Sequence, residues 1–300
     1  MELKQLQSFV TVATWGSFTR AAELLYLSQP TISAHIRQLE EELHTRLISR
    51  TTKTVELTPK GKEVYEYAVN ILELRNRMVS ACSDEHQNVI HLGASTIPSS
   101  YILPEILPIY GKQHPDTYFV IHQSDSQGVV NGLLDGIFDI GMSGMCTGEA
   151  SLIWEPFYRD RMTVITPVNE HFLTLQRENT ASIQELLKEP MIFRENGSGS
   201  KKSADQLIES LGISQADLRI TACVNDQETI KNLVAGGLGI SIISEKAARN
   251  FWEEKRVLMF KFPELDSTRD LYLVHRKDDI LNGRVLDFMK FMKSYFHNKS

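Results

Sequence analysis

The chain has little cysteine and no long apolar run, and both shortages narrow the class of protein. Its three cysteines, Cys82, Cys146 and Cys223, are widely spaced along 300 residues. An odd number at such spacing predicts neither a disulfide framework nor a metal knuckle. No run of about 18 apolar residues occurs, and the first residues lack the basic and then apolar pattern of a signal peptide. We therefore expect a globular, cytoplasmic protein with no membrane partner.

The sequence also lacks the short motifs that mark common enzymes. It contains no Gly-x-Ser-x-Gly, no His-Glu-x-x-His and no complete dinucleotide or Walker pattern. Its nine histidines show no metal-ligand spacing. We expect no catalytic residue, no metal and no cofactor. An enzyme whose catalytic groups meet only in the folded chain stays open as an alternative.

An excess of positive charge, common among nucleic-acid-binding proteins, is missing as well. The formal net charge is −6, and residues 1–58 carry six basic and six acidic side chains. Tight DNA binding by this region would therefore need a dimer or a larger oligomer, because each copy of the chain adds contacts to phosphates.

The N-terminal region does contain three helical patterns, over residues 3–13, 17–25 and 28–43. In the third, Ser28 can cap the helix and Pro30 is tolerated in the first turn. Its apolar residues follow the helical period: Ile32, Ile36, Leu39 and Leu43. Short or polar residues remain on the other surface: Gln29, Thr31, Ser33, Ala34, Arg37 and Gln38. Such side chains fit the major groove, so the pattern predicts a helix-turn-helix with a DNA-recognition helix.

A hairpin and a long helix follow. Residues 47–57 alternate like a β-hairpin with Arg50 and Lys53 near its tip, which is typical of a DNA-binding wing. Thr58-Pro59 then opens a helix of residues 59–82. Its apolar residues form a stripe: Val64, Ala68, Ile71, Leu72, Met78 and Val79. We expect this stripe to lack a core of its own and to pack against a second copy in a homodimer, with packing on its own chain as the alternative.

From Val89 onward, short strands alternate with helices, which is typical of an α/β fold. The predicted strands are residues 89–94, 118–121, 138–142, 162–165, 191–193, 219–222, 239–243 and 270–274. Because some 210 residues are many for one sheet, we expect two lobes with a cleft between them.

Hydroxyl and amide groups gather at four strand-to-helix junctions. These are Ser95-Thr96-Ile97-Pro98-Ser99-Ser100, Asp125-Ser126-Gln127, Asn196-Gly197-Ser198-Gly199-Ser200 and Asn225-Asp226-Gln227-Glu228-Thr229. Each alone is typical of a helix cap. Free amides at helix N-termini also bind anions, and ligands of α/β sheets sit at such junctions. The four together favour a pocket for a small polar molecule, and Gly197-Ser198-Gly199 with Lys201 and Lys202 just after it favours an anionic one.

These patterns resemble the LysR-type transcriptional regulators over essentially the whole chain. The residues in the family's order and spacing are Phe9, 17–25, 28–33, 36–40, Leu43, Leu47, Arg50 and 57–61. The resemblance implies a winged helix-turn-helix, a dimerising linker helix and a two-lobed effector domain similar to periplasmic binding proteins. The boundaries we expect are 1–58, 59–88 and 89–300, with lobe I at about 89–161 and 268–300 and lobe II at about 162–267.

The resemblance also implies partners and site residues. Members are usually bacterial homotetramers that bind interrupted inverted repeats of double-stranded DNA near promoters and respond to a small metabolite. The expected DNA contacts are Gln29, Pro30, Thr31, Ser33, Arg37, Arg50, Thr51 and Lys53. The expected effector contacts are Ser95, Thr96, Ser99, Ser100, Ser126, Ser198, Asp226 and Gln227.

Two details refine this hypothesis. Many members have a basic residue where this chain has Ala34, so one family contact to DNA is expected to be missing. The opening Gly93-Ala94-Ser95-Thr96 is similar to members that govern sulfur and related oxyanion metabolism. The alternative hypothesis is a small-molecule binding protein whose N-terminal domain serves only oligomerisation. The effector, the target genes, activation or repression, and dimer or tetramer stay open.

Overall fold

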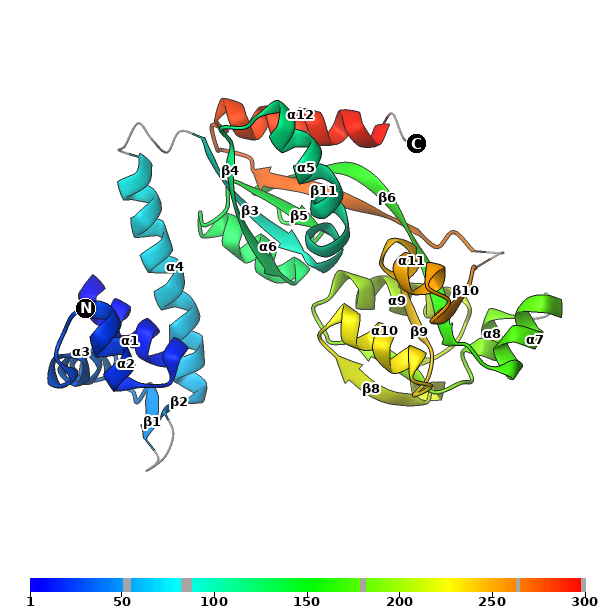
Figure 1. The fold of residues 1–300 in the computed structure, drawn as a ribbon, viewed down its shortest axis with the longest axis horizontal. Helices are drawn as coiled ribbons and strands as arrows, with labels where there is room; N and C mark the ends of the chain where they lie inside the picture. Colours follow the sequence, from blue (N-terminus) through cyan, green and yellow to red (C-terminus); the bar gives the residue numbers. More distant parts are fainter. Residues whose placement is uncertain (51–54, 82–87, 179–181, 263–264, 298–300) are drawn as a thin grey trace. The chain divides into compact units, whose positions relative to one another are not determined.

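A computed structural model gives the fold. It describes residues 1–300 apart from 51–54, 82–87, 179–181, 263–264 and 298–300. The chain divides into two compact units, Met1–Gln87 and Asn88–Ser300 (Figure 1). No helix of the described residues is long and apolar enough to span a membrane.

The first unit begins with three helices, α1 (Leu3–Trp15), α2 (Phe18–Leu25) and α3 (Gln29–Glu42). Ser17 and Ser28 cap α2 and α3, because their side chains accept hydrogen bonds from the amides of Arg20 and Thr31. The predicted apolar face of α3 is confirmed for Ile32, Ile36 and Leu39, which are buried together with Phe9 of α1. Leu43 is the exception. It ends the helix and is 37% exposed.

Polar contacts also fix α3 against α1. The Oγ of Ser8 and the Nδ1 of His35 lie 2.8 Å apart in a buried hydrogen bond. The Nε2 of Gln5 donates to the Oε1 of Gln38 at 3.0 Å. Hydrogen bonds require specific distances and angles, so they set the rotation of α3 more narrowly than apolar packing alone.

The hairpin predicted after α3 is present as β1 (Ile48–Arg50) and β2 (Val55–Leu57), which pair antiparallel. A buried carboxylate joins it to α3. The Oε1 of Glu40 accepts from the amides of Leu47 at 2.8 Å and Ile48 at 3.1 Å, and its Oε2 accepts from Arg46 at 3.0 Å. The first strand of the wing therefore begins at a fixed place beside α3.

The linker helix is α4 (Pro59–Ala81), and its apolar residues divide into two groups. Val64, Ala68 and Leu72 pack on the core of the helix-turn-helix, so the expectation that the whole stripe lacks a core in its own chain is wrong. A second group is exposed: Tyr67, Ile71, Leu74, Met78 and Val79. Only this second group needs a partner to cover it.

The second unit contains one long sheet whose strand order is β10-β6-β11-β5-β3-β4, with β9 also paired to β6. Four of its strands follow α4 in sequence: β3 (Val89–Ser95), β4 (Tyr118–Ser124), β5 (Ile140–Ser143) and β6 (Leu152–Pro167). They are joined by β11 (Thr268–Arg276), from near the end of the chain. Strand β3 runs parallel to β4 and β5, and β11 runs antiparallel to β5 and β6. Around them lie η2 (Pro98–Ile102), α5 (Leu103–Gln113), α6 (Ser126–Leu134) and α12 (Gly283–His297).

Strand β6 continues into a second group of elements. Its last residues pair with β9 (Ser241–Ser244) and β10 (Val257–Phe260), whereas its first part pairs with β11. The remaining elements are β7 (Met191–Arg194), β8 (Ile220–Val224), α7 (Glu170–Glu178), α8 (Ile183–Leu186), α9 (Gly199–Ser210), η3 (Gln215–Asp217), α10 (Gln227–Ala235) and α11 (Glu245–Glu253). We call residues 88–161 and 268–300 lobe I and residues 162–267 lobe II; both are visible in Figure 1.

Replacing Glu40 with Ala should destabilise the first unit. The buried amides of Leu47 and Ile48 would lose their acceptor, and an unsatisfied buried group costs about 1–3 kcal/mol. We expect a lower thermal unfolding midpoint and faster hydrogen–deuterium exchange in peptides that contain Leu47 and Ile48. Glu66 is exposed on α4, so Glu66→Ala is the matched control. Equal effects of the two substitutions would contradict this role of Glu40.

Candidate effector cleft and DNA-binding surface

The outer side of α3 carries the residues expected to read DNA. Arg37 is exposed, and its Nε lies 3.8 Å from the Oε1 of Glu41, which is equally exposed. Such a surface pair contributes little energy, so the guanidinium remains free to contact DNA. The other expected residues are on the same helix, exposed or half-buried: Gln29, Pro30, Thr31 and Ser33.

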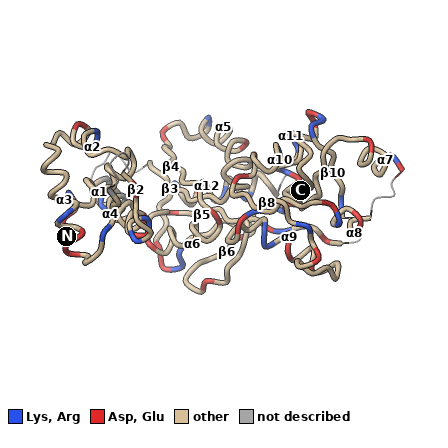
Figure 2. Tube along the Cα trace, turned by 90° about the horizontal axis from the view of Figure 1, so that it is seen from below, with Lys and Arg blue, Asp and Glu red and all other residues tan. Residues whose placement is uncertain are grey.

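The expected wing contacts are described less fully. Arg50 belongs to β1 by its backbone, and Thr51 and Lys53 lie outside the described residues. Figure 2 shows Lys and Arg mixed with Asp and Glu along the tube, the N-terminal unit included. The charge distribution therefore agrees with the neutral count from the sequence and supplies no broad basic face among the described residues.

A cavity lies between the two lobes of the second unit. Its lining comes from both lobes: Ser95, Thr96, Ile97, Asp125, Ser126, Gly144, Ser198, Gly199, Ser200 and Arg269. Its volume is about 10 Å³, which is about the space that one water molecule needs. A metabolite can enter only when the lobes move apart.

Four of the eight expected effector residues line this cavity, namely Ser95, Thr96, Ser126 and Ser198. Of the other four, Ser99 donates to the side chain of Gln123, and Ser100 is exposed. These two lie in the wide turn of η2, which follows the lining residues directly.

Asp226 and Gln227 are outside the lining of the cavity too. Asp226 caps α10, and the amide and hydroxyl of Thr229 donate to its Oδ2 at 2.7 and 2.6 Å. Hydrogen bonds from Thr229 lower the pKa of Asp226. The buried Oε1 of Gln227 accepts from Arg194 at 3.4 Å. These residues stabilise the start of α10 and its contact with the end of β7.

Two serines that are largely buried line the cavity with hydroxyls that have no protein partner. Ser126 of lobe I is 2% exposed and Ser198 of lobe II is 6% exposed, and neither side chain has a hydrogen-bond partner among the described residues. Ser95 differs, because its Oγ accepts from the amide of Gly144 at 3.1 Å. Ser198 also precedes α9 without capping it. Unused hydrogen-bonding capacity therefore comes from both lobes.

Glycines allow the lobes to meet at this point. A Cβ on Gly199 would lie 3.0 Å from the Oγ of Ser126 and 3.1 Å from the carbonyl oxygen of Gly144. Gly197 has a φ of +92°, and a Cβ there would lie 2.9 Å from the Oδ2 of Asp125. A side chain at Gly199 would therefore crowd Ser126 and Gly144 of lobe I, and one at Gly197 would strain the backbone as well.

Arg269 is a lining residue that the sequence did not indicate. Its Nε and Nη2 donate to the Oδ2 of Asp160 at 3.0 and 2.9 Å; Asp160 is buried, and the Arg269 side chain is 9% exposed. Asp160 also accepts from the Oγ of Ser244, and Arg269 donates to the hydroxyls of Ser200 and Ser203. The positive charge of Arg269 is thus already balanced inside the protein.

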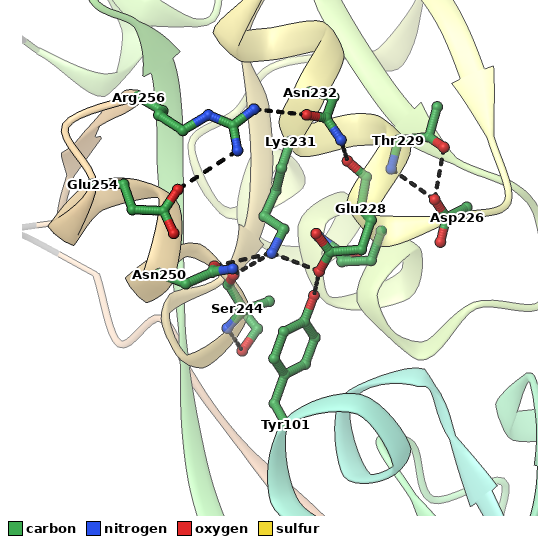
Figure 3. Close-up of polar contacts among 12 residues, drawn as sticks. Tyr101, Asp226, Glu228, Thr229, Lys231, Asn232, Ser244, Asn250, Glu254 and Arg256 are labelled. Carbon is green, nitrogen blue, oxygen red and sulfur yellow. Dashed lines mark hydrogen bonds and ion pairs between the residues drawn. The ribbon is translucent and has the colours of Figure 1, made fainter. Parts of the chain in front are cut away.

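A buried lysine connects the lobes farther along the cleft (Figure 3). Lys231 of α10 is fully buried, and its Nζ contacts Glu228 at 2.7 Å, Asn250 at 3.0 Å and the carbonyl of Ala247 at 3.1 Å. Tyr101 of lobe I donates to the same Oε1 of Glu228 at 2.7 Å. Burial and then the hydrogen bond to Glu228 raise the pKa of Tyr101, so its hydroxyl stays a donor at neutral pH.

A second polar contact joins the lobes. Lys246 of α11 pairs with Glu105 of α5, and the hydroxyl of Tyr295 donates to the same carboxylate at 2.9 Å. The lobes therefore meet through hydrogen bonds and ion pairs on one side and through the small cavity on the other. One hydrophobic cluster also spans the two lobes, with Ile102 of lobe I and Ile230 and Phe251 of lobe II among its buried residues.

Lobe I also has a larger depression, of about 480 Å³, between β6 and the end of α12. Arg159 forms an exposed salt bridge with Asp266, and Lys293 forms one with Glu155. It lies away from the junctions where strands end and helices begin. Among the described residues, no cluster of His, Cys, Asp and Glu side chains is able to hold a metal ion.

Two family models match the chain. Residues 3–62 match the bacterial regulatory helix-turn-helix protein of the lysR family, and residues 83–297 match the LysR substrate binding domain. The chain belongs to the LysR family of transcriptional regulators. The resemblance and the fold class expected from the sequence are confirmed. A DNA-binding regulator with an effector-binding domain is therefore favoured over a protein whose N-terminal domain only oligomerises.

Relatives align over nearly the full length. An uncharacterized HTH-type transcriptional regulator of Methanocaldococcus jannaschii, MJ0300, is 30% identical over 97% of this chain and 98% of its own. The crystal structure of CbnR, a LysR family transcriptional regulator, has a TM-score of 0.72 at 20% identity and covers 99% of both chains. The effector-binding domain of QuiR in complex with shikimate has a TM-score of 0.62 at 20% identity, over 70% of this chain and 97% of that one.

Replacing Tyr101 with Phe should loosen the contact between the lobes. The substitution removes one hydrogen bond, which contributes about 1 kcal/mol. Hydrogen–deuterium exchange in peptides of α10 should then be roughly fivefold faster. Tyr118 is exposed on β4, so Tyr118→Phe serves as the control. Unchanged exchange in Tyr101→Phe would show that its hydroxyl does not hold the lobes together.

Proposed function

We propose that this LysR-family regulator responds to a small anionic metabolite bound between lobes I and II. The observation that carries this proposal is a pair of hydroxyls, on the largely buried residues Ser126 and Ser198, which line one cavity from opposite lobes and make no protein hydrogen bond among the described residues. Each hydroxyl can therefore donate to a ligand in the cavity. Oxygens of an anion would accept from both, and the N-terminus of α9 favours negative charge.

Binding would act by shifting an equilibrium between open and closed lobes. The closed cavity has room for about one water molecule, so the metabolite must enter an open state. Closure around it then adds contacts from both lobes. A ligand that binds the two states with different affinities shifts their populations, and this change reaches the DNA-binding unit through the oligomer.

DNA would be read by α3 and the wing. Gln29 and Arg37 have side chains that pair with base edges, and Thr31 and Ser33 are short enough to enter the major groove beside them. Pro30, Arg50, Thr51 and Lys53 complete the contacts that we propose. Ala34 provides no cation, which agrees with the neutral charge of this region.

The exposed group of residues on α4 supports a homodimer. Tyr67, Ile71, Leu74 and Met78 are separated by four, three and four residues, the spacing of a coiled-coil seam. A second copy covers this face and brings a second recognition helix to the DNA. We propose a homodimer through α4 and its assembly into a homotetramer on an interrupted inverted repeat, which multiplies the phosphate contacts of a neutral DNA-binding domain.

The class of metabolite is a further part of the proposal. The hydroxyl-rich end of β3 with Ser95 and Thr96 at the cavity makes sulfur or related oxyanion metabolism our candidate pathway. Hydroxyls and backbone amides suit an oxyanion because each donates a hydrogen bond without adding a full charge.

The double variant Ser33→Ala, Arg37→Ala should lose operator binding and keep its oligomeric state. Fluorescence anisotropy against DNA from upstream of its own gene, over a salt series, measures the first, and sedimentation measures the second. Wild-type binding should weaken with salt because phosphate contacts release counterions. Unchanged affinity of the double variant would contradict the assignment of α3, and a wild-type monomer would contradict the dimer.

The double variant Ser126→Ala, Ser198→Ala should lose the response to effector. A thermal-shift screen of anionic metabolites with the full-length wild type identifies the ligand, and the affinity of the variant should then fall at least about tenfold, because hydrogen bonds to charged groups contribute about 1.5–3 kcal/mol each. Ser294→Ala, in the larger depression, is the control. If only Ser294→Ala lost the response, the effector site would lie in the larger depression and not between the lobes.

A further inference from the structure

Asp125 contributes a carboxylate to the cavity, and only one of its two oxygens accepts a hydrogen bond. Its Oδ1 caps α6 by accepting from the amide of Gly128 at 2.6 Å. Its Oδ2 has no donor among the described residues and points toward lobe II, where a Cβ on Gly197 would lie 2.9 Å away. The Oδ2 of Asp125 is therefore an acceptor at the cavity that no protein group among the described residues donates to.

The charge of Asp125 is not offset by the other lining groups. The only cation in the described lining is Arg269, and Asp160 already pairs with it through two hydrogen bonds. The remaining lining side chains are hydroxyls, glycines and Ile97. An anion without a proton would place its oxygen lone pairs against those of Asp125, which is repulsive.

A ligand that carries a hydrogen-bond donor would be attracted to Asp125 instead of repelled by it. A hydroxyl or a protonated oxyanion can give the Oδ2 of Asp125 the hydrogen bond that it lacks. The hydroxyls of Ser126 and Ser198 and the start of α9 can donate to the anionic oxygens of the same molecule. The cavity thus presents donors from both lobes and one unused acceptor, the Oδ2 of Asp125, from lobe I.

We infer that Asp125 selects an effector that is an anion and also carries a proton donor, such as a hydroxy acid or a protonated oxyanion, and excludes anions without one. This inference rests on the proposed effector site. Sites built to hydrogen-bond a ligand hydroxyl strongly reject the analogue that lacks it, because the partner group is left unsatisfied.

Two matched pairs of small anions test the inference with the full-length protein. Isothermal titration calorimetry compares inorganic phosphate, which carries a proton at neutral pH, with sulfate, and glycolate with acetate. We expect the donor-bearing member of each pair to bind at least about tenfold more tightly. In Asp125→Asn the preference should fall toward parity, because the amide can donate to sulfate or acetate and has no charge to repel them.

Asparagine is also a good helix cap, so Asp125→Asn should keep the bond to the amide of Gly128 and fold normally. Asp116→Asn, which removes one exposed negative charge from the same lobe, should keep the wild-type preference. Binding of sulfate and acetate as tightly as their partners would overturn the inference and leave the effector site standing. Binding of none of the four anions would overturn the anionic site itself together with the inference.

Discussion

The buried ion pair between Asp160 and Arg269 is the constraint on which the second unit depends. The two residues are direct neighbours across β6 and β11, at the point where β6 leaves one lobe for the other. The pair also contacts Ser244 at the end of β9 and Ser200 and Ser203 on α9. Losing one member of such a pair leaves an uncompensated buried charge and costs about 3–5 kcal/mol. The ion pair and its hydroxyl partners therefore link β6, β9, β11 and α9 where β6 passes from lobe I to lobe II.

The remaining polar contacts between the lobes are individually weak. The hydrogen bond from Tyr101 to Glu228 and the pair of Lys246 with Glu105 involve groups that water can solvate when the lobes separate. Each such contact contributes about 1 kcal/mol. The lobes also share one hydrophobic cluster, so the free-energy difference between open and closed lobes depends on apolar packing as well as on these polar contacts.

Sequence reasoning succeeded where the determining interactions are local. Helix α3 was predictable because its cap, Pro30 and the period of Ile32, Ile36 and Leu39 lie within a few turns. Ser95, Thr96, Ser126 and Ser198 were predictable because each stands beside the end of a strand or the start of a helix. Long-range geometry was not predictable. Nothing local marks Arg269 as the partner of Asp160.

The same limit explains the errors in the fold. The first part of β6 contains Pro156 and several charges, so residues 152–161 lack an alternating pattern although β11 pairs with them. Strand β10 was missed because residues 257–260 are a short apolar run between charged segments. Ser99 and Ser100 were expected at the cavity, and the wide turn of η2 carries them past it.

The division of apolar residues along α4 has a geometric consequence for the operator. Val64, Ala68 and Leu72 pack one face of α4 on the core of the helix-turn-helix. The exposed apolar residues of α4 lie outside that core: Tyr67, Ile71, Leu74, Met78 and Val79. A partner that docks on this exposed face would be connected to the helix-turn-helix through α4, a single helix of 23 residues that is roughly 35 Å long. The distance between the two recognition helices of the dimer would then be fixed. A change in the spacing of the DNA half-sites would have to be met by bending the DNA.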